Sequence, residues 1–414
     1  MSWTQKTLGE IVNLKRGFDL PSSSRADGPY PVFSSSGQTG THSKAAVKGP
    51  CVVTGRYGTI GQVFFSDAAC WPLNTSLYST DFKGNDPKFV YYLLKTIPWR
   101  DYLTASAVPG INRNHVHLCP VCVPDYETQT AISGVLGLLD NKIELNTKLN
   151  GYLLDLATAQ FEAALKERAS NVRLGDIIGL EDSKRVPLNS RDRESRKGPY
   201  PYYGATSIMD YVDDYLFDGV RVLLGEDGSV IDSEGKPVLQ YVWGRYWVNN
   251  HAHILKAAGA YPLEAIYVAL RRTSIGHIVT GAVQMKISQR NLKKLEVSMP
   301  DPGSLDYLQP LFAAYRNLCE ESRHLVTLRD TLLPKLMTGE IDVSELNLKQ
   351  LNSHLAKSLR QLGRHVSPHK NGAASTPANC PAPPAITLQH QPAPLPYFPK
   401  IAPNRPLRLG FSSR

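Results

Sequence analysis

The chain repeats itself, and this repeat constrains its fold more than any other feature. The string LGEI at 8–11 returns as LGDI at 174–177, and GPYPVF at 28–33 returns as GPYPYY at 198–203. Gly55 and Gly58 return as Gly225 and Gly228, and Val-Pro-Asp at 123–125 returns as Met-Pro-Asp at 299–301. Because the order is kept and the offset changes only as small loop insertions would change it, we expect a tandem duplication of about 170 residues.

The first part of each copy is predicted to form a mixed α/β domain. Short apolar stretches are broken there by Gly, Pro, Asn and Ser, as in CVVTGRYGTIGQVFF from Cys51 onward. β-branched and aromatic residues between turn residues are typical of strands. Residues 88–97 and 262–272 are predicted as short helices. The chain is therefore expected to be an α+β protein with domains at 1–126 and 169–300.

The second part of each copy predicts a long helix. No proline occurs from Thr128 to Arg168, and apolar residues recur there at helical spacing: Ile132, Leu136, Leu139 and Ile143, followed by Leu149, Leu153 and Leu156. In the other copy, apolar residues recur every seven positions: Leu311, Leu318, Leu325 and Leu332. Such stripes are typical of coiled coils, in which the polar Asn146 and Asn150 would set the register. Asp125 and Asp301-Pro302 are the expected N-terminal caps, and Pro334 should kink or end the second helix.

The two helical regions, 127–168 and 301–345, are expected to pack against each other. A helix of about 40 residues is about 60 Å long, which exceeds the size of a domain of about 120 residues. The alternative, in which each helix packs only on its own domain, leaves most of such a rod uncovered. We therefore expect an antiparallel coiled coil between the two domains, related by a pseudo-twofold axis.

The net charge of +9 does not by itself indicate what the folded part binds. Residues 346–414 carry nine Lys and Arg and no acidic residue, so the charges of residues 1–345 sum to zero. This segment also holds 11 of the 30 prolines and few large apolar residues. Such a composition predicts a disordered C-terminal tail. Both a basic arm that adds nonspecific DNA affinity and an appendage without a role in recognition are open.

The sequence also indicates the cellular compartment in which the protein is expected. No run of 18 apolar residues occurs, and MSWTQKTLGE lacks the basic-then-apolar order of a signal peptide. The six cysteines are scattered and do not form a disulfide framework. We expect a cytoplasmic protein without a membrane partner.

These motifs resemble the specificity subunit of type I restriction–modification enzymes. The openings LGEI and LGDI, the GPYPVF block followed by GQTG, and GRYGTIG resemble the target recognition domains of that family. LLDNKIELNTKLN at 138–150 resembles the central helical region, and LRDTLLPKLMTGEIDV at 328–343 the distal one. The resemblance covers residues 1–345. It implies that each domain recognises one half of a split site in double-stranded DNA, and that the helices set the gap.

The resemblance also implies partners. Two modification (methyltransferase) subunits would dock on the helical stripes, and restriction (translocase and nuclease) subunits would join them. S-adenosylmethionine, ATP and Mg²⁺ are then implied in the partner subunits, with no cofactor bound by this chain. The predicted partner-binding residues are the stripe positions: Ile132, Leu136, Leu139, Ile143, Leu311, Leu318, Leu325 and Leu332.

Motifs of catalysis are missing from the sequence, so we expect neither a catalytic nor a metal site. No Asn/Asp-Pro-Pro-aromatic loop, G-x-G-x-x-G turn or G-x-x-x-x-G-K-[ST] loop occurs. Two alternatives stay open: a methyltransferase or nuclease with fused recognition domains, and a coiled-coil scaffold that binds protein or glycan. Salt dependence separates the scaffold from DNA binding, because phosphate contacts weaken steeply with salt.

Candidate DNA contacts are polar, cationic or aromatic residues in predicted loops, since cations bind phosphates and forked or amide side chains bind base edges. In the first domain they are Ser34, Ser35, Ser36, Gln38, Lys44, Arg56, Tyr57, Asn112, Arg113, Asn114 and His115. In the second they are Arg191, Arg193, Arg196, Lys197, Tyr203, Thr206, Ser207, Arg245, Tyr246, Asn249, Asn250, His251, Lys286, Gln289, Arg290 and Asn291. Glu226 stands where the first copy has Arg56. A carboxylate there could accept a hydrogen bond from cytosine, or the glycine loops could be structural in both copies.

Overall fold

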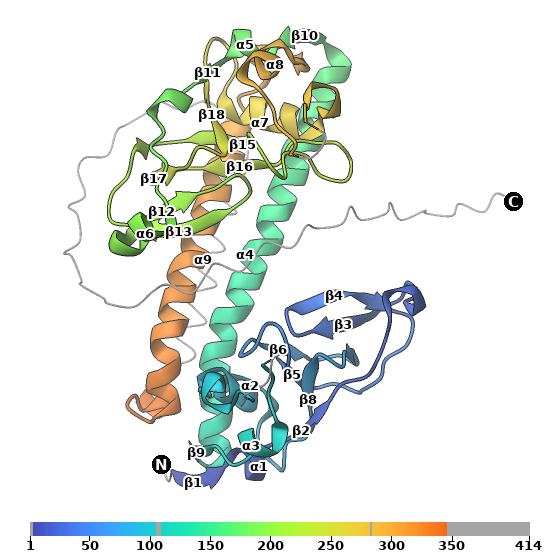
Figure 1. The fold of residues 1–414 in the computed structure, drawn as a ribbon, viewed down its shortest axis with the longest axis vertical. Coiled ribbons are helices and arrows are strands. Elements are labelled where there is room, and N and C mark those ends of the chain that lie inside the picture. Colours follow the sequence, from blue (N-terminus) through green and yellow to red (C-terminus); the bar gives the residue numbers. More distant parts are fainter. Residues whose placement is uncertain (1–2, 105–108, 282–283, 346–414) are drawn as a thin grey trace, which may run out of the picture. The chain divides into compact units, whose positions relative to one another are not determined.

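The structure is a computed structural model that describes residues 3–104, 109–281 and 284–345. The predicted disordered tail, 346–414, lies outside these residues. Figure 1 shows the order of the elements, with the first domain in blue, the second in green and yellow, and the two long helices α4 and α9 side by side. Among the described residues, no helix is both long and apolar enough to span a membrane.

The first domain contains three small sheets. Their strands are β1 (Thr4–Thr7), β2 (Asn13–Arg16), β3 (Tyr30–Ser34), β4 (Gly37–His42), β5 (Cys51–Gly55), β6 (Val63–Ser66), β7 (Trp71–Pro72), β8 (Ser76–Asp81) and β9 (Pro120–Val123). The helices are α1 (Leu8–Ile11), α2 (Pro87–Thr96) and α3 (Arg113–Val116), with 3₁₀ turns η1 (Ser22–Ser24) and η2 (Trp99–Tyr102). The sheet orders are β1-β9, β4-β3-β7 and β2-β8-β5-β6.

The second domain repeats this plan. Its strands are β10 (Ala169–Arg173), β11 (Ile178–Leu180), β12 (Lys197–Tyr203), β13 (Ile208–Val212), β14 (Phe217–Asp218), β15 (Arg221–Gly225), β16 (Leu239–Val242), β17 (Arg245–Val248), β18 (Ala252–Ala257) and β19 (Glu296–Pro300). The helices are α5 (Leu174–Ile177), α6 (Ser190–Ser195), α7 (Leu263–Arg272) and α8 (Gln289–Lys294), with 3₁₀ turns η3 (Asp182–Lys184) and η4 (Gly276–Ile278). The sheet orders are β10-β19, β13-β12-β17-β14 and β11-β18-β15-β16. The duplication predicted from the sequence is therefore confirmed at the level of sheet order.

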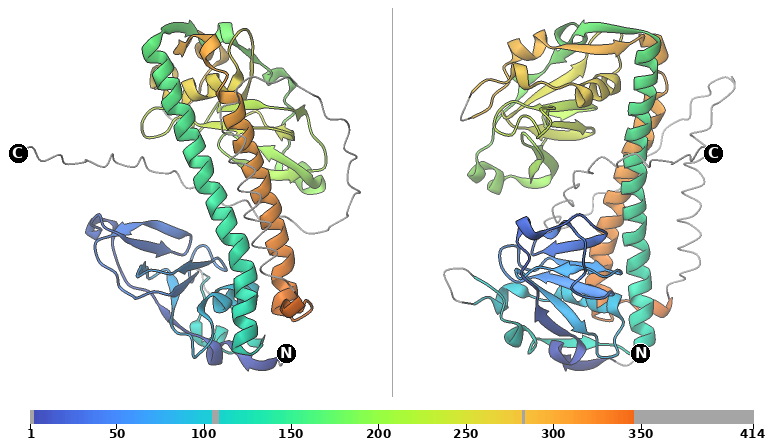
Figure 2. Two further views of the ribbon diagram at one scale, coloured as in Figure 1. Left: turned by 180° about the vertical axis from the view of Figure 1, so that it is seen from behind. Right: turned by 90° about the vertical axis from the view of Figure 1, so that its right-hand side faces the viewer.

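The helices α4 (Tyr126–Glu167) and α9 (Leu308–Met337) form an antiparallel pair. Asp140 of α4 bonds Arg329, Asn146 bonds Ser322, and Asn150 bonds Cys319, so partners in α9 fall in number as those in α4 rise. Figure 2 shows the two helices side by side in both of its views. The predicted cap is confirmed, because the Asp125 side chain accepts from the Thr128 N–H at 2.9 Å.

The start of the second helix was predicted wrongly. Residues 302–304 form a 3₁₀ turn, η5 (Pro302–Ser304), and Asp301 caps that turn by accepting from the Gly303 N–H. The helix then begins at Leu308, after Leu305 has entered the core of the second domain. Pro334 lies inside the last turn of α9, which ends three residues later. A further 3₁₀ turn, η6 (Val343–Glu345), follows.

Each domain has its own core, and each core includes parts of both long helices. The first contains Leu8, Phe89 and Leu94 together with Leu136 of α4 and Leu336 of α9. The second includes residues from the other ends of the helices: Ala157, Phe161, Leu308, Leu311 and Phe312. The predicted stripe residue Leu156 is 40% exposed, because the helix turns Ala157 and Phe161 inward instead. Both helices are thus part of both domains.

Candidate nucleic-acid interface

In the first domain, a hairpin and a glycine loop lie next to each other. Ser35 and Ser36 form the turn between β3 and β4, and Gly55 is the last residue of β5, directly before the glycine loop. A Cβ atom on Gly55 would lie 1.8 Å from the Thr59 carbonyl oxygen and 3.1 Å from that of Ser35. Only glycine fits where these backbones approach so closely. The repeated glycine therefore fixes the position of the residue that follows it, Arg56.

Arg56 and Tyr57 lie against a second polar segment. Their backbone N–H groups both donate to the Thr75 carbonyl, and the Arg56 carbonyl accepts from the Ile111 N–H at 3.0 Å. The Arg56 guanidinium lies 4.5 Å from the centre of the Tyr57 ring. A Cβ atom on Gly110 would lie 2.2 Å from that ring, so this glycine makes room for it. The structure thus brings the predicted contacts at 56–57 and 112–114 together.

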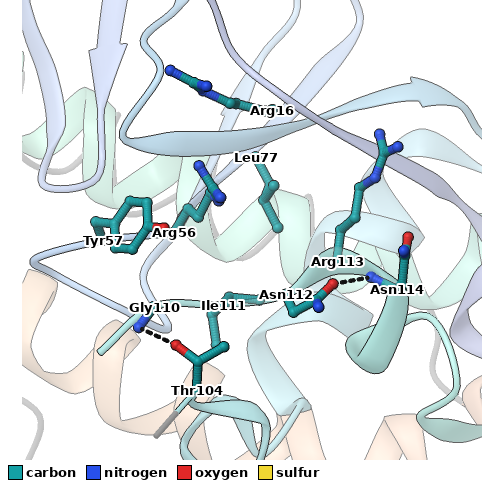
Figure 3. A pocket seen from close by; sticks show the side chains of 10 residues that line it. All are labelled: Arg16, Arg56, Tyr57, Leu77, Thr104, Gly110, Ile111, Asn112, Arg113 and Asn114. Carbon is teal, nitrogen blue, oxygen red and sulfur yellow. Dashed lines mark hydrogen bonds between the residues drawn. The ribbon is translucent and has the colours of Figure 1, made fainter. Parts of the chain in front are cut away.

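These residues line a pocket of about 290 Å³. Figure 3 shows arginine side chains at this pocket from three separate segments: Arg16 at the end of β2, Arg56 after β5, and Arg113 in α3. The remaining lining residues are Tyr57, Leu77, Thr104, Gly110, Ile111, Asn112 and Asn114. None of these described lining residues is acidic. Arg16 forms an exposed ion pair with Asp19 at 3.6 Å, whereas neither Arg56 nor Arg113 has an ion-pair partner within the described part of the chain.

The same place in the second domain can be found from the strand registers. Gly55 pairs with Ser76, and Gly225 pairs with Ala252, so Arg56 corresponds to Glu226 and Leu77 to His253. Arg16 lies two residues beyond Leu14 in β2 and pairs with Leu77. Leu14 pairs with Ser79 and Leu180 with Leu255, which hold equivalent places two residues after Leu77 and His253. Asp182 lies two residues after Leu180, the last residue of β11, and so corresponds to Arg16.

The third arginine has an equivalent of its own. Asn112 and Ser288 are the N-caps of the equivalent helices α3 and α8. Their first helical residues, Arg113 and Gln289, therefore correspond. Three arginines in one domain are thus replaced by two carboxylates and an amide in the other.

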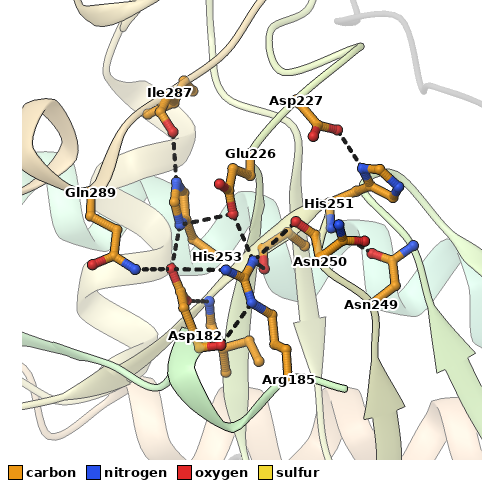
Figure 4. Close-up of polar contacts among 12 residues, drawn as sticks. Asp182, Arg185, Glu226, Asp227, Asn249, Asn250, His251, His253, Ile287 and Gln289 are labelled. Carbon is orange, nitrogen blue, oxygen red and sulfur yellow. Dashed lines mark hydrogen bonds and ion pairs between the residues drawn. The ribbon is translucent and has the colours of Figure 1, made fainter. Parts of the chain in front are cut away.

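The residues that stand in place of the three arginines belong to one network of hydrogen bonds in the second domain (Figure 4). The Asp182 carboxylate lies 2.6 Å from Nδ1 of His253 and accepts from the Gln289 amide at 2.6 Å. Arg185 donates to Glu226 at 2.7 Å and to the Ala252 carbonyl at 2.8 Å. The second ring nitrogen of His253, Nε2, lies 2.8 Å from the Ile287 carbonyl oxygen. We call these five residues, Asp182, Arg185, Glu226, His253 and Gln289, the closed cluster.

The negative charges of the carboxylates in the closed cluster are balanced by hydrogen bonds and positive charges within the second domain. Burial by itself raises the pKa of the Asp182 carboxyl, but the hydrogen bonds from His253 and from the Ile254 N–H outweigh burial and hold the pKa below its ordinary value. Possible ligand atoms of Asp182, Glu226 and His253 lie within 4.8 Å of one another, a spacing that could hold a metal ion. Arg185 and Lys286, 2.7 and 3.5 Å from Glu226, already supply positive charge there.

The basic run at 191–197 is largely neutralised. Arg193 and Lys197 pair with Asp210 of β13 at 3.2 and 2.8 Å, and Arg196 pairs with Asp213 at 2.9 Å. Arg191 is exposed and, among the described residues, forms no ion pair. These acids lie outside the run itself, so the sequence did not indicate that they would pair with it.

Three predicted contacts belong to the interior instead. Tyr246 is 0% exposed, and Tyr203 packs against it edge to face within the same core. Asn249 is 3% exposed and accepts from the His251 N–H. Side chains with so little exposed surface do not present a face to a base edge, so the prediction that these three contact DNA is wrong.

The remaining candidates lie at or near the surface. In the first domain these are Ser34, Ser35, Ser36, Gln38, Lys44 and His115. In the second they are Thr206, Ser207, Arg245, Asn250, His251, Lys286, Arg290 and Asn291. Of these, Arg245 pairs with Asp218 at 3.3 Å and His251 lies 2.6 Å from Asp227. Their role in DNA contact stays a prediction.

The predicted partner-binding stripe is mostly buried inside the chain. Six of its residues are at most 9% exposed: Ile132, Leu136, Leu139, Leu311, Leu318 and Leu325. Ile143 and Leu332 are half-buried. The six buried side chains pack the helices against each other and against the domains, so the prediction that they bind a partner is wrong for them; for Ile143 and Leu332 it stays a prediction. Large apolar residues that are exposed on α4 are Tyr126, in its first turn, and Leu145, Tyr152 and Leu156 farther along the helix.

Sequence reasoning missed Arg16, Asp182, Arg185 and His253. A signal for two of them exists, because Arg16 and Asp182 hold the same position after the repeated LGEI and LGDI strings. Arg185 and His253 have no such signal, since only the fold brings them beside Glu226.

Together, these features define a class of protein: a duplicated scaffold whose paired domains present loops and share two long helices. The sequence model of the type I restriction modification DNA specificity domain matches residues 1–153 and 167–309. The chain therefore belongs to this family and carries two copies of its domain.

Relatives agree with this family. A putative type I restriction enzyme specificity subunit of Haemophilus influenzae is 30% identical over 127 residues, which are 31% of this chain and 32% of the relative. The MjaIX specificity subunit of Methanocaldococcus jannaschii is 24% identical over 303 residues, 63% of this chain and 70% of the relative. The match thus spans only a third of the first of these relatives. The crystal structure of the type I restriction-modification S subunit from M. genitalium has a TM-score of 0.53 at 20% identity, covering 81% of this chain and 96% of that one, and shows the same fold.

Proposed function

We propose that the chain is the DNA specificity subunit of a type I restriction–modification complex. Each domain recognises one half of a bipartite site in double-stranded DNA, and the α4–α9 pair sets the unspecified gap between the halves. The observation that carries this proposal is the duplication itself: two domains of one topology share one antiparallel helix pair yet differ in the residues at equivalent loop positions. Equal folds with different loop residues suit two different half-sites.

The chain supplies recognition, and its partners supply chemistry. The relatives named above are specificity subunits. Adenine methylation then belongs to modification subunits that bind S-adenosylmethionine, and ATP-driven, Mg²⁺-dependent cleavage belongs to restriction subunits. A cytoplasmic location follows from this role.

Docking of the modification subunits uses three exposed apolar residues in the middle and second half of α4. Leu145, Tyr152 and Leu156 are 37%, 66% and 40% exposed, and they are spaced by seven and four residues. This spacing places them on one face of the helix. The buried stripe is unavailable because it holds the two domains on the helices.

Methylome mapping tests the proposal. Cells that express this chain with the modification subunit of its own operon should gain a methylated-adenine motif with two short specified halves and a fixed gap. Cells that lack only this chain should not. Co-purification of the two proteins without any motif would contradict the recognition role, and failure to associate would contradict the scaffold role as well.

A further inference from the structure

We infer that Arg16, Arg56 and Arg113 form a seat for one phosphate of the DNA backbone, and that the second domain has no such seat. This inference rests on the proposed function and names the contact that the first domain makes. The three side chains lie at one pocket, which we call the arginine pocket (Figure 3).

Charge is the first reason. Three guanidinium groups share a small pocket whose described lining holds no carboxylate, and two of them have no ion pair among the described residues. Like charges held together repel one another, so this arrangement is stabilised by an anion that enters it. A guanine edge is neutral and is bound by a single arginine, whereas a backbone phosphate is an anion whose oxygens can accept hydrogen bonds from more than one arginine.

The walls of the pocket are the second reason. Leu77 and Ile111 are 1% and 2% exposed and form an apolar part of the lining. Such residues exclude water and strengthen charge-assisted hydrogen bonds. The Tyr57 ring holds the Arg56 guanidinium at 4.5 Å, and the Asn112 side chain accepts from the Asn114 N–H at 3.0 Å. These contacts orient the lining before a ligand arrives.

The second domain is the third reason, because the equivalent place there carries no excess of positive charge. Asp182, Glu226 and Gln289 replace the three arginines, and His253 replaces Leu77. Arg185 and Gln289 satisfy the two carboxylates from within the domain. An incoming phosphate would find cations that are already paired with carboxylates there. The two domains therefore hold the DNA backbone differently at equivalent places.

The test removes single charges from the DNA backbone and, separately, from the arginine pocket. It uses the full chain bound to its modification subunits. In duplexes that carry the recognised motif, one phosphate at a time is replaced by an uncharged methylphosphonate. For the unaltered protein, one position should weaken binding about tenfold, as expected for loss of a charge-assisted contact. In the double variant Arg56→Gln/Arg113→Gln, the same methylphosphonate should have no further effect. Lys48→Gln, which removes an exposed cation outside the lining of the arginine pocket and outside the predicted DNA contacts, should keep the full effect.

Salt dependence gives a second readout. On duplex DNA without the motif, losing one phosphate contact should make the slope of log K against log salt less negative by about 0.9. If the unaltered protein shows no preference for any motif, the proposed function fails, while this slope still tests the pocket.

Four outcomes overturn the inference. Double-variant affinity equal to that of the unaltered protein would show that the pocket does not contact DNA. A changed base in the methylated motif, without coupling to any methylphosphonate, would show that the arginines contact a base. If the double variant no longer binds inorganic phosphate in calorimetry but keeps its DNA affinity, the pocket binds a free anion and not the DNA backbone. A lowered melting temperature, with loss of affinity for every duplex alike, would show a structural role, since removing repelling charges should not destabilise the domain.

Discussion

Arg56 and Glu226 follow equivalent glycines, but they have different roles. Arg56 is half-exposed and stacks on Tyr57. Glu226 is held by Arg185, and its side chain is 15% exposed. Because Arg185 donates to Oε2 of Glu226, a hydrogen bond from cytosine, as suggested from the sequence, would use the other carboxylate oxygen, Oε1. At this position the second domain uses a polar residue for its own stability.

Replacing Arg185 by Gln should destabilise the second domain by about 3 kcal/mol, because Arg185 is the cation nearest to Glu226, at 2.7 Å, and also lies 3.7 Å from the poorly hydrated Asp182 carboxylate. The change should also raise the pH at which this domain unfolds in acid. Asp182 has a lowered pKa in the folded protein, so its contribution is present above the unfolded pKa of about 4 and is lost as the pH falls through the folded pKa. Without Arg185 the folded pKa moves up toward the unfolded one.

Hydrogen exchange of β15 and β18 measures this prediction. Arg191→Gln is the matched control, because Arg191 is exposed and, among the described residues, has no ion pair. Exchange in β2 and β8 of the first domain should not change. Unchanged protection in β15 and β18 would show that the closed cluster does not stabilise the domain.

At the level of residues, the sequence identified candidates that lie within short loops, and their contact with DNA stays a prediction. Arg56, Tyr57, Asn112 and Arg113 were identified from two glycine- and asparagine-rich loops, and the fold brings these loops to one pocket. Sequence reasoning failed for the closed cluster because Asp182 and His253 are 71 residues apart. No periodicity indicates that a buried histidine will meet an aspartate across two strands.

The α4–α9 pair is held at its centre by polar contacts. The Lys142 ammonium lies 2.9 Å from Glu321, although the Lys142 side chain is only 3% exposed. Asn146 donates to the same carboxylate at 2.9 Å, and Arg329 donates to Asp140 at 2.7 Å. A polar contact between helices can be satisfied in only one register, so these contacts fix how the helices slide along each other. The sequence predicted the role of Asn146 and Asn150, but not their partners.

Glu321→Gln should destabilise the helix pair by about 3 kcal/mol, because it leaves a buried ammonium without a counter-charge. Thermal unfolding followed by circular dichroism at 222 nm measures the loss. Glu144→Gln is the control: it removes an exposed carboxylate paired with Lys148 four residues on, and should cost less than about 0.5 kcal/mol.

The double variant Lys142→Met/Glu321→Leu separates charge from packing. It should recover most of the stability lost in Glu321→Gln, since both charges are removed together. Equal melting temperatures for Glu321→Gln and the unaltered chain would contradict a buried charge pair at this position.

At the scale of the whole molecule, the duplication was predictable because it is written in repeated strings. The first long helix was also placed within a residue of its ends, since proline is absent and Asp125 caps it. Its partner was predicted too long, because the turn at Pro302 and the buried Leu305 belong to the second domain. The shared cores were not predictable, because a stripe of leucines does not say which surface covers it.

Exchanging whole domains tests how far the two halves of the molecule are independent. Replacing residues 1–126 by the first domain of a relative with a different motif should change one half of the methylated motif and leave the other half and the gap unchanged. The grafted domain must keep an aspartate at the position of Asp125, which caps α4, and a tyrosine at that of Tyr92, which donates to Asp140 at 2.7 Å. Without them the exchange would disturb the helices as well as the domain.

The reciprocal exchange of residues 169–300 is the control, and it should change only the other half. Both cores contain α4 and α9, so a change in the gap after either exchange would show that the domains, rather than the helices alone, set the spacing. A change in both halves after a single exchange would contradict independent recognition. If each exchange alters one half of the motif alone, the shared helices act as a rigid support. Features that differ between the domains, such as the arginine pocket of the first and the closed cluster of the second, then affect only the half-site that their own domain recognises.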